Sequence, residues 1–311
     1  MVMDIRKTLL LVKGEVTYDT DPTPTGAANA ILASGVTVDE NFAALARGEQ
    51  WPSLDHLPSV AGAKYASIKF STPICLSGVA GTAPRLGALL KACAHSETVI
   101  SSTSVTYAPV SANHGSCTIY VYMDGRLQKF TGCMGDAKFS FPAGKMAEIA
   151  WTFVGRYADP TASALVTPTY ETTIKTPVVC KSMTLSYNAK TTLVVATGEL
   201  DLGIKVINRE NLADPNGIAG FEITDRDPKI TIDPETIASL TDFNFRSDWL
   251  NTTRAVIMGA GLTAGNIITV NAPQFMIEKL TPANRNGIAT EKIEGQCAAS
   301  AGDDSYSIVL T

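Results

Sequence analysis

Acidic pairs, histidines, cysteines and a glycine-rich stretch are the features of this chain whose spacing could support chemistry. Glu199 and Asp201 lie two residues apart, so a strand would place both carboxylates on one face, where they could act as an acid–base pair. We interpret them as a solvated strand face or a functional acidic surface. Gly259–Gly265 has the glycine spacing of a dinucleotide-binding turn, but Asn266–Asn271 is typical of a strand, whereas that turn requires a helix. We therefore interpret the stretch as a hairpin loop.

The histidines and cysteines lack the spacing of a metal site. Cys93 and His95 could face one ion, but no second ligand pair follows them. No serine lies in a G-x-S-x-G motif. We therefore predict no catalytic residue, no bound metal and no cofactor. The cysteines are widely spaced with no C-x-x-C pair, which favours reduced, buried thiols and synthesis in a cytoplasm: Cys75, Cys93, Cys117, Cys133, Cys180 and Cys297.

Length and charge narrow the class of protein. At roughly 100–200 residues per domain, 311 residues indicate about two domains. The chain has 25 basic and 30 acidic residues, so it lacks the basic surface that a duplex-binding protein needs. Charged residues are only 18% of the total, which suggests that much of the surface is covered by something other than water. The apolar run Leu9–Val12 is far too short to span a bilayer, so we expect no membrane association.

Alternating apolar and polar residues dominate the chain and predict a mainly β protein. Thr, Val, Ile and Tyr recur with period two between Gly, Pro, Asn-Gly and Asp-Gly turns. Asp124-Gly125 is the clearest hairpin turn, between Cys117–Met123 and Leu127–Cys133. Short helices are predicted over Pro84–Ala94 and Thr241–Leu250.

The same order of elements occurs twice. Each half has an opening hairpin, a strand, one short helix, a β-meander and a closing strand that begins at glycine, namely Gly144–Gly155 and Gly287–Gly295. The Pro- and Thr-rich segment Ala158–Pro177 separates the halves and is typical of a linker. We therefore predict a duplicated domain, with residues 1–160 and 178–311 as the two copies and residues 161–177 as the linker. Two unrelated β domains are the alternative.

Several segments resemble tail tube proteins of long-tailed, non-contractile bacteriophages. The segments are Thr17–Leu32, Ser104–Ser111, Tyr122–Gly132, Ala150–Arg156, Asn271–Pro282 and Asn286–Glu294. The resemblance implies that each half is a small β-sandwich or half-barrel with one flanking helix. It also implies stacked rings around a lumen that holds the tape-measure protein and later passes DNA without specific binding. Tail-tip and terminator proteins would be further partners, and the location would be the virion tail after synthesis in the host bacterial cytoplasm.

Length is where the chain departs from this family. A subunit with a single tube fold is near half this size, so two folds per chain would let three chains build a pseudo-six-fold ring. Two other classes stay open. One is a β-sandwich adhesin or receptor-binding module of a virion, and the other is a carbohydrate-active enzyme, which would need two carboxylates about 5–10 Å apart.

The segment Asp39–Gly62 has no clear periodicity and is too long for an ordinary connection. We predict a loop that acts as an assembly arm and becomes ordered on contact with the next ring. The alternative is an Ω-like loop that packs on its own domain. The apolar side chains that would make the inter-ring contact are Phe42, Leu45, Trp51, Leu54 and Leu57.

A channel for DNA should repel phosphate weakly, so its wall should carry acids and small hydroxyls rather than Lys or Arg. Strand residues that alternate with apolar ones share a face. By this criterion Glu199, Asp201 and Glu222 are the acidic candidates for the lumen wall, with Thr224 beside the last. Their placement on the outer surface is the alternative.

Overall fold

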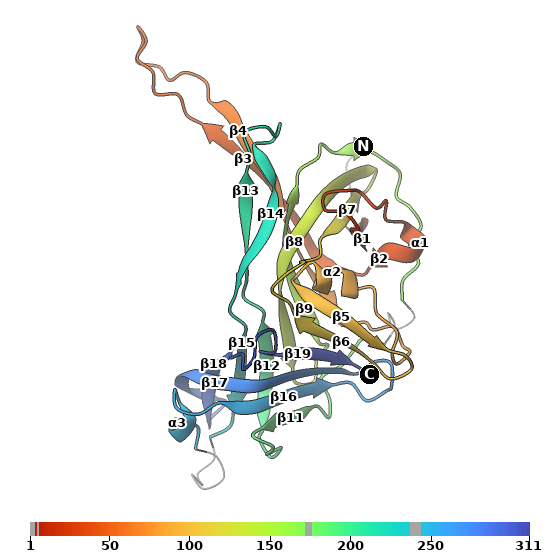
Figure 1. Cartoon of the computed structure of the whole chain (residues 1–311), viewed down its shortest axis with the longest axis vertical. Helices are drawn as coiled ribbons and strands as arrows, with labels where there is room; N and C mark the ends of the chain where they lie inside the picture. The colour runs from red at the N-terminus through yellow and green to blue at the C-terminus, as the bar shows by residue number, and fades with distance from the viewer. Residues whose placement is uncertain (1–3, 5, 172–175, 237–243) are drawn as a thin grey trace.

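The chain folds into a long β structure from which one hairpin projects (Figure 1). The computed structural model describes residues 4, 6–171, 176–236 and 244–311. The elements are β1 (Thr8–Gly14), α1 (Gly26–Asn29), β2 (Ala30–Ile31), β3 (Ser34–Leu45), β4 (Val60–Pro73), α2 (Gly87–Lys91), β5 (His95–Ile100), β6 (Ser104–Pro109), β7 (Cys117–Met123), β8 (Arg126–Pro142), β9 (Glu148–Arg156), β10 (Thr161–Ala162), β11 (Thr184–Tyr187), β12 (Val195–Asp201), β13 (Ile204–Glu210), β14 (Ile218–Arg226), β15 (Lys229–Pro234), α3 (Phe245–Asp248), β16 (Arg254–Ala260), β17 (Ile268–Arg285), β18 (Ile288–Cys297) and β19 (Ser307–Leu310).

The strands are stabilised because every second side chain is buried in the core. In β9, Ile149, Trp151 and Phe153 are buried while the residues between them face outward. The Asp124-Gly125 turn joins β7 to β8 as predicted, and both of its residues have positive φ, at 32° and 95°. The mainly β fold, with short helices and large antiparallel sheets, confirms the predicted fold class and is consistent with a β-sandwich.

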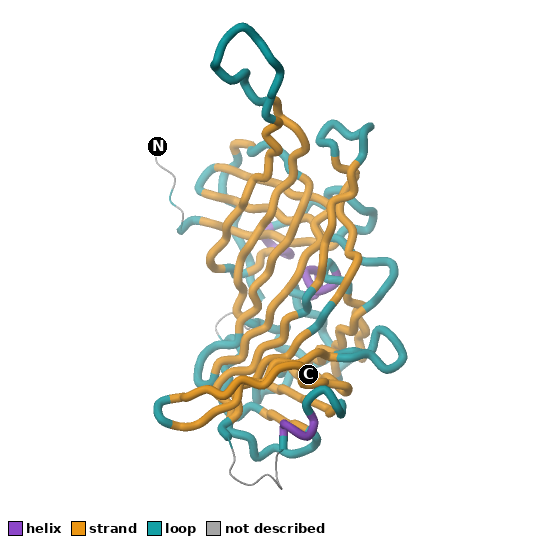
Figure 2. The backbone as a smooth tube through the Cα atoms, turned by 90° about the vertical axis from the view of Figure 1, so that its left-hand side faces the viewer, coloured by secondary structure: helices purple, strands orange, loops and turns teal. Residues whose placement is uncertain are grey.

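Eight strands form one continuous antiparallel sheet along the body of the molecule, in the order β3–β4–β9–β8–β12–β15–β18–β17. Figure 2 shows the long strands side by side and the hairpin extending past them. The first parts of β8 and β17 leave this sheet and pair elsewhere, with β7 and β16 respectively. This arrangement creates two sandwich-like layers with the core between them.

The two halves of the chain repeat the same strand neighbours. In the first half the order of pairing is β1–β7–β8–β9–β4–β3, and in the second it is β11–β16–β17–β18–β15–β12. A short helix precedes the second strand of each pairing order: α2 lies before β7, with β5 and β6 between them, and α3 lies directly before β16. The repeated neighbours support the predicted duplication, which a superposition of the two halves would test.

The halves are joined by more than the linker. Residues Lys138–Pro142 of β8 pair with Thr197–Asp201 of β12, and β19 pairs with β6 of the first half. We call the β8–β12 pairing the internal joint. A single apolar cluster contains Phe139 from one half and Leu200 from the other. The two halves therefore share one core.

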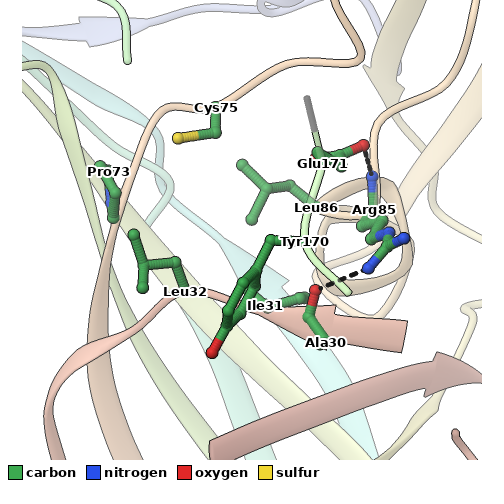
Figure 3. Close-up of a pocket in the computed structure, with 9 residues that line it drawn as sticks. All are labelled: Ala30, Ile31, Leu32, Pro73, Cys75, Arg85, Leu86, Tyr170 and Glu171. Carbon is green, nitrogen blue, oxygen red and sulfur yellow. Dashed lines mark hydrogen bonds between the residues drawn. The ribbon is translucent and has the colours of Figure 1, made fainter. Parts of the chain in front are cut away.

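The first part of the linker is fastened to the first half. β10 pairs with β8, and Val166 and Tyr170 pack on a separate small apolar cluster of β1 and β7. The backbone N–H of Arg85 donates to Oε1 of Glu171 at 2.9 Å, and its guanidinium donates to the carbonyl of Ala30 at 3.1 Å (Figure 3). Residues 172–175 of the linker lie outside the described residues.

The segment Asp39–Gly62 is not a loop throughout, contrary to prediction. β3 continues to Leu45, β4 begins at Val60, and the two residues are paired. We call residues 39–62 the arm and its non-strand residues, 46–59, the arm tip. Outside the core both faces of these strands are exposed, so no alternation marks them in the sequence.

The predicted helices are shorter than expected. α2 is limited to Gly87–Lys91 within the range Pro84–Ala94, and α3 to Phe245–Asp248. Residues 241–243 of the second predicted helix lie outside the described residues. Part of the difference at α2 is a run of turns at its start, where the N–H of Gly87 donates to the carbonyl of Pro84 at 2.9 Å.

Candidate functional site

The eight-stranded sheet has one face in the core, and its other face is polar except where the β13–β14 hairpin packs on β4, β8 and β9. Phe139 and Leu200 point into the core, whereas Lys138, Glu199 and Asp201 lie on the opposite face. We call this second surface the polar face. The internal joint runs through its centre, so β8 and β12 bring residues of both halves together here.

Cross-strand ion pairs cover the polar face. Lys138 Nζ lies 2.9 Å from Glu199 Oε2, and this contact raises the pKa of Lys138. Lys229 Nζ lies 3.2 Å from Glu278 Oε2. Cross-strand pairs also join Lys69 to Asp39, Lys279 to Glu294 and Arg285 to Asp233, and Lys292 pairs with Glu294 within β18. These pairs are partly exposed and contribute about 0–1 kcal/mol each. The face therefore carries lysines and acids together rather than the acids and hydroxyls expected of a channel wall.

Glu222 lies elsewhere. It is on β14, which pairs with β13 in a separate two-stranded sheet. Its carboxylate is 3.5 Å from Nδ1 of His114 and 3.7 Å from Nη1 of Arg209. The structure thus brings Glu199 and Asp201 together on the polar face and does not bring Glu222 to them.

Asp136 of β8 is a titratable group at the polar face that the sequence did not single out. Burial raises its pKa to about 6, and the Asp201 carboxylate adds to the effect. The backbone N–H of Ile204 donates to its Oδ1 at 3.0 Å and acts in the opposite direction. A carboxylate with a raised pKa is costly to keep ionised, and no sequence motif marks such a position.

Replacement Asp136→Asn is expected to stabilise the protein at neutral pH. The pKa of Asp136 in the native state lies above its ordinary value of 3.8, so the native state binds more protons between pH 4 and 6. The free energy of unfolding therefore falls as pH rises through that window. We expect a gain of about 2 kcal/mol at pH 7.5 and no difference at pH 4. Denaturant unfolding of both proteins at each pH measures this. A variant that is less stable at pH 7.5 would show that the charge itself is needed.

The arm holds all five predicted apolar residues. At its base, the rings of Phe42 and Tyr157 meet edge to face at 4.9 Å. Towards the tip, Leu45 and Trp51 are about half exposed, Leu54 is fully exposed and Leu57 is partly buried. The segment thus presents apolar side chains to solvent.

Internal hydrogen bonds shape the arm tip. Nε1–H of Trp51 donates to the carbonyl of Asp55 at 2.6 Å, and the hydroxyl of Ser53 donates to the Asp55 carboxylate at 2.8 Å. The tip is therefore a formed turn rather than an extended strand.

An apolar cavity of about 300 Å³ lies between β11, β12, β16 and the end of β8. We call it the end cavity. It is lined by Phe141, Ala143, Cys180, Ser182, Met183, Leu185, Leu193, Val195, Ala196, Thr197, Gly198 and Met258. Sequence analysis missed it because these residues come from separate segments and share no motif. A second cavity, beside Arg85 and Tyr170, has about 20 Å³ and holds a water molecule at most (Figure 3).

The cysteines and histidines form no evident reaction centre. All six cysteines are buried free thiols, as expected. Nε2 of His95 lies 2.8 Å from the Tyr306 hydroxyl, and burial lowers the pKa of this histidine to about 4. Within the described residues, no group of three His, Cys, Asp or Glu side chains is placed to hold a metal ion. Across the same part of the chain, no helix is both long and apolar enough to cross a membrane.

A sheet shared by both halves and a projecting arm with exposed apolar side chains are features of a protein that assembles with other subunits. Comparison with protein families agrees, since the model of the phage tail tube protein family matches residues 5–301. The chain belongs to this family, so it is a structural protein of a phage tail and a component of the virion. A search of curated proteins gave no match.

Proposed function

We propose that this chain is the repeating subunit of a tail tube whose rings contain three copies. Each copy contributes two similar halves, which gives a pseudo-six-fold ring, and stacked rings enclose the tape-measure protein and later the ejected DNA. Tail-tip and terminator proteins would close the two ends. The subunits would be made in the host cytoplasm before assembly. Family membership supports the tube, and the internal joint supports the ring.

The internal joint is the observation that carries the proposal. It pairs the second part of β8, from the first half, with β12, from the second half. In the repeated order, β17 corresponds to β8 and β3 corresponds to β12. Among the described residues, β3 pairs only with β4, and β17 pairs only with β18 beyond Lys279. One copy thus presents two free strand edges, β3 and the end of β17, which correspond to the two strands of the internal joint.

The faces of the strands restrict how two copies can pair. Val38 of β3 and Leu280 of β17 pack towards the core, so Asp39 and Ala283 lie on the polar face. A joint between copies must match core face to core face, because a slip of one residue would turn every side chain over. The sheet would then continue from copy to copy and close on itself without a free edge.

Cysteine pairs test this ring. We expect Asp39→Cys to form a disulfide between copies when combined with one of Thr281→Cys, Ala283→Cys or Arg285→Cys, because all four positions share the polar face. Mild oxidation should give covalent trimers on a non-reducing gel. The native thiols are buried and do not compete.

The matched control combines Asp39→Cys with Asn284→Cys, whose side chain lies on the opposite face. This control should give no covalent trimer. Equal cross-linking of the control, or none with the three polar-face partners, would reject the proposed joint.

Glu199 and Asp201 are proposed to line the lumen. They lie on the polar face beside the internal joint, and the proposed ring turns one face of the joined sheets inward. The ion-paired lysines leave this surface close to neutral. A nearly neutral wall would hold DNA weakly, which suits a passage better than an attractive surface.

A further inference from the structure

The end cavity and the arm lie at opposite ends of the molecule. In Figure 1 the β3–β4 hairpin projects at the upper end, while β11, β12 and β16, which line the cavity, lie at the lower end. A contact between opposite ends of identical subunits is heterologous and repeats without limit, so it builds a stack.

The end cavity is formed where β12 begins. The pairing of β12 with β15 is irregular between Val195 and Gly198, and Gly198 has no side chain to fill the space. Its Cβ, if present, would lie 3.0 Å from Sδ of Met258. The space is apolar because Phe141, Leu193 and Met258 line it. The side chain of methionine is flexible, so Met258 can adjust to an entering side chain.

The arm tip presents apolar side chains that suit such a space. Trp51 and Leu54 expose an indole ring and an isobutyl group on one short turn. An aromatic residue buries about 150–250 Å² when it is covered, which makes Trp51 a strong anchor. The hydrogen bonds from Trp51 and Ser53 already shape the turn, so little conformational entropy is lost on binding.

Charges around the two surfaces are complementary. The arm tip carries Glu49 and Asp55 against one arginine, Arg47. Lys181 follows Cys180 at the cavity, and Lys145 is close because its carbonyl accepts from the N–H of Cys180 at 2.8 Å. Both lysines are exposed, and among the described residues neither forms an ion pair. The cavity thus has a basic rim facing an acidic tip.

We propose that the arm tip of one copy binds in the end cavity of a copy in the neighbouring ring, with Trp51 and Leu54 as anchors and Lys145 and Lys181 at the rim. This inference rests on the proposed function, since it assigns the surface that receives the arm. The partner is therefore a second copy of this chain.

Rings with one defective surface test the contact. An arm variant, Trp51→Ala with Leu54→Ala, and a cavity variant, Ala196→Phe, should each form cross-linkable rings but no tubes. When rings of the two variants are mixed in equal amounts, they should form pairs of rings and nothing longer. The cavity variant keeps an intact arm and the arm variant keeps an intact cavity, so each pair can make one contact and cannot be extended. Electron microscopy counts single rings, pairs and tubes.

A charge exchange tests the same contact without changing the cavity lining, so its result does not depend on whether Ala196→Phe folds. Lys181→Glu should raise the protein concentration needed for tubes at least tenfold, and adding Glu49→Lys should restore much of the loss. Tubes of normal length from Ala196→Phe, or no rescue by Glu49→Lys, would overturn the cavity as the receiving site. If the protein with an intact arm and cavity, carrying Asp39→Cys and its polar-face partner, gave no cross-linked rings, the proposed function itself would be overturned.

Discussion

A chain that carries Val38→Pro is expected to fold as a soluble subunit and to form no rings. At the internal joint the N–H of Leu202, a core-facing residue, donates to the carbonyl of Ala137 at 3.1 Å. In a strand, residues that share a face direct their N–H groups to the same edge. The N–H of Val38, which packs towards the core, therefore points to the free edge of β3. Proline removes that donor but keeps the apolar bulk.

The effect should be large because the opposing edge is already poor in donors. Pro282 lies in the free part of β17 and has no N–H, so the joint depends more on the N–H groups of β3. A buried carbonyl left without a donor costs about 1–3 kcal/mol, and the cost recurs at every joint of the ring. Val38→Ala is the matched control, since it removes side-chain contacts and keeps the N–H. Light scattering and cross-linking should show rings for the control alone. Rings from the proline variant would exclude β3 as a partner edge.

The sequence predicted elements whose pattern depends on burial. β9 was found because one face of the strand is in the core, and the β7–β8 hairpin because Asp124-Gly125 favours its turn. The ends of β3 and β4 in the arm were taken as a loop because neither face is buried. Alternation of apolar and polar residues appears when one face of a strand is buried and the other is exposed to solvent. Both faces of the arm strands are exposed, so their sequence does not alternate.

Contacts between distant segments were beyond the sequence. The sequence predicted a linker over residues 161–177 but did not predict that β8 and β12, on either side of it, pair with each other. Backbone hydrogen bonds between strands that are far apart in the chain leave no local sequence pattern. β17 continues through Pro273, beside an irregularity in its pairing with β16 between Arg254 and Val256. The five arm residues were singled out because apolar groups in an aperiodic segment are unusual, and their contact with a neighbouring ring stays a prediction. The end cavity left no such signal, because four separate segments form it.

Reversal of charge at Glu199 and Asp201 is expected to turn the polar face into a DNA-binding surface. Asp201 lies opposite Lys138 on one neighbouring strand and Lys229 on the other. Glu199→Lys with Asp201→Lys would therefore place four lysines side by side, with no acid between them. Free variant subunits should bind duplex DNA at low salt, where the parent should not. The affinity should fall with a log–log salt slope of about −2 to −4, as phosphate contacts release counterions.

Assembly distinguishes a lumen face from an outer one. Closed circular DNA cannot thread a tube, so tubes of the lysine variant should leave a circular plasmid unbound although the free subunits bind it. Glu199→Gln with Asp201→Asn is the matched control, because it removes the same negative charges and adds no positive ones, and it should bind DNA in neither state. In virions, the lysine variant should slow DNA ejection, and the delay should shrink as salt rises because screening acts within about 8–10 Å. Plasmid bound along the outside of variant tubes would place Glu199 and Asp201 on the outer surface and reject the lumen assignment.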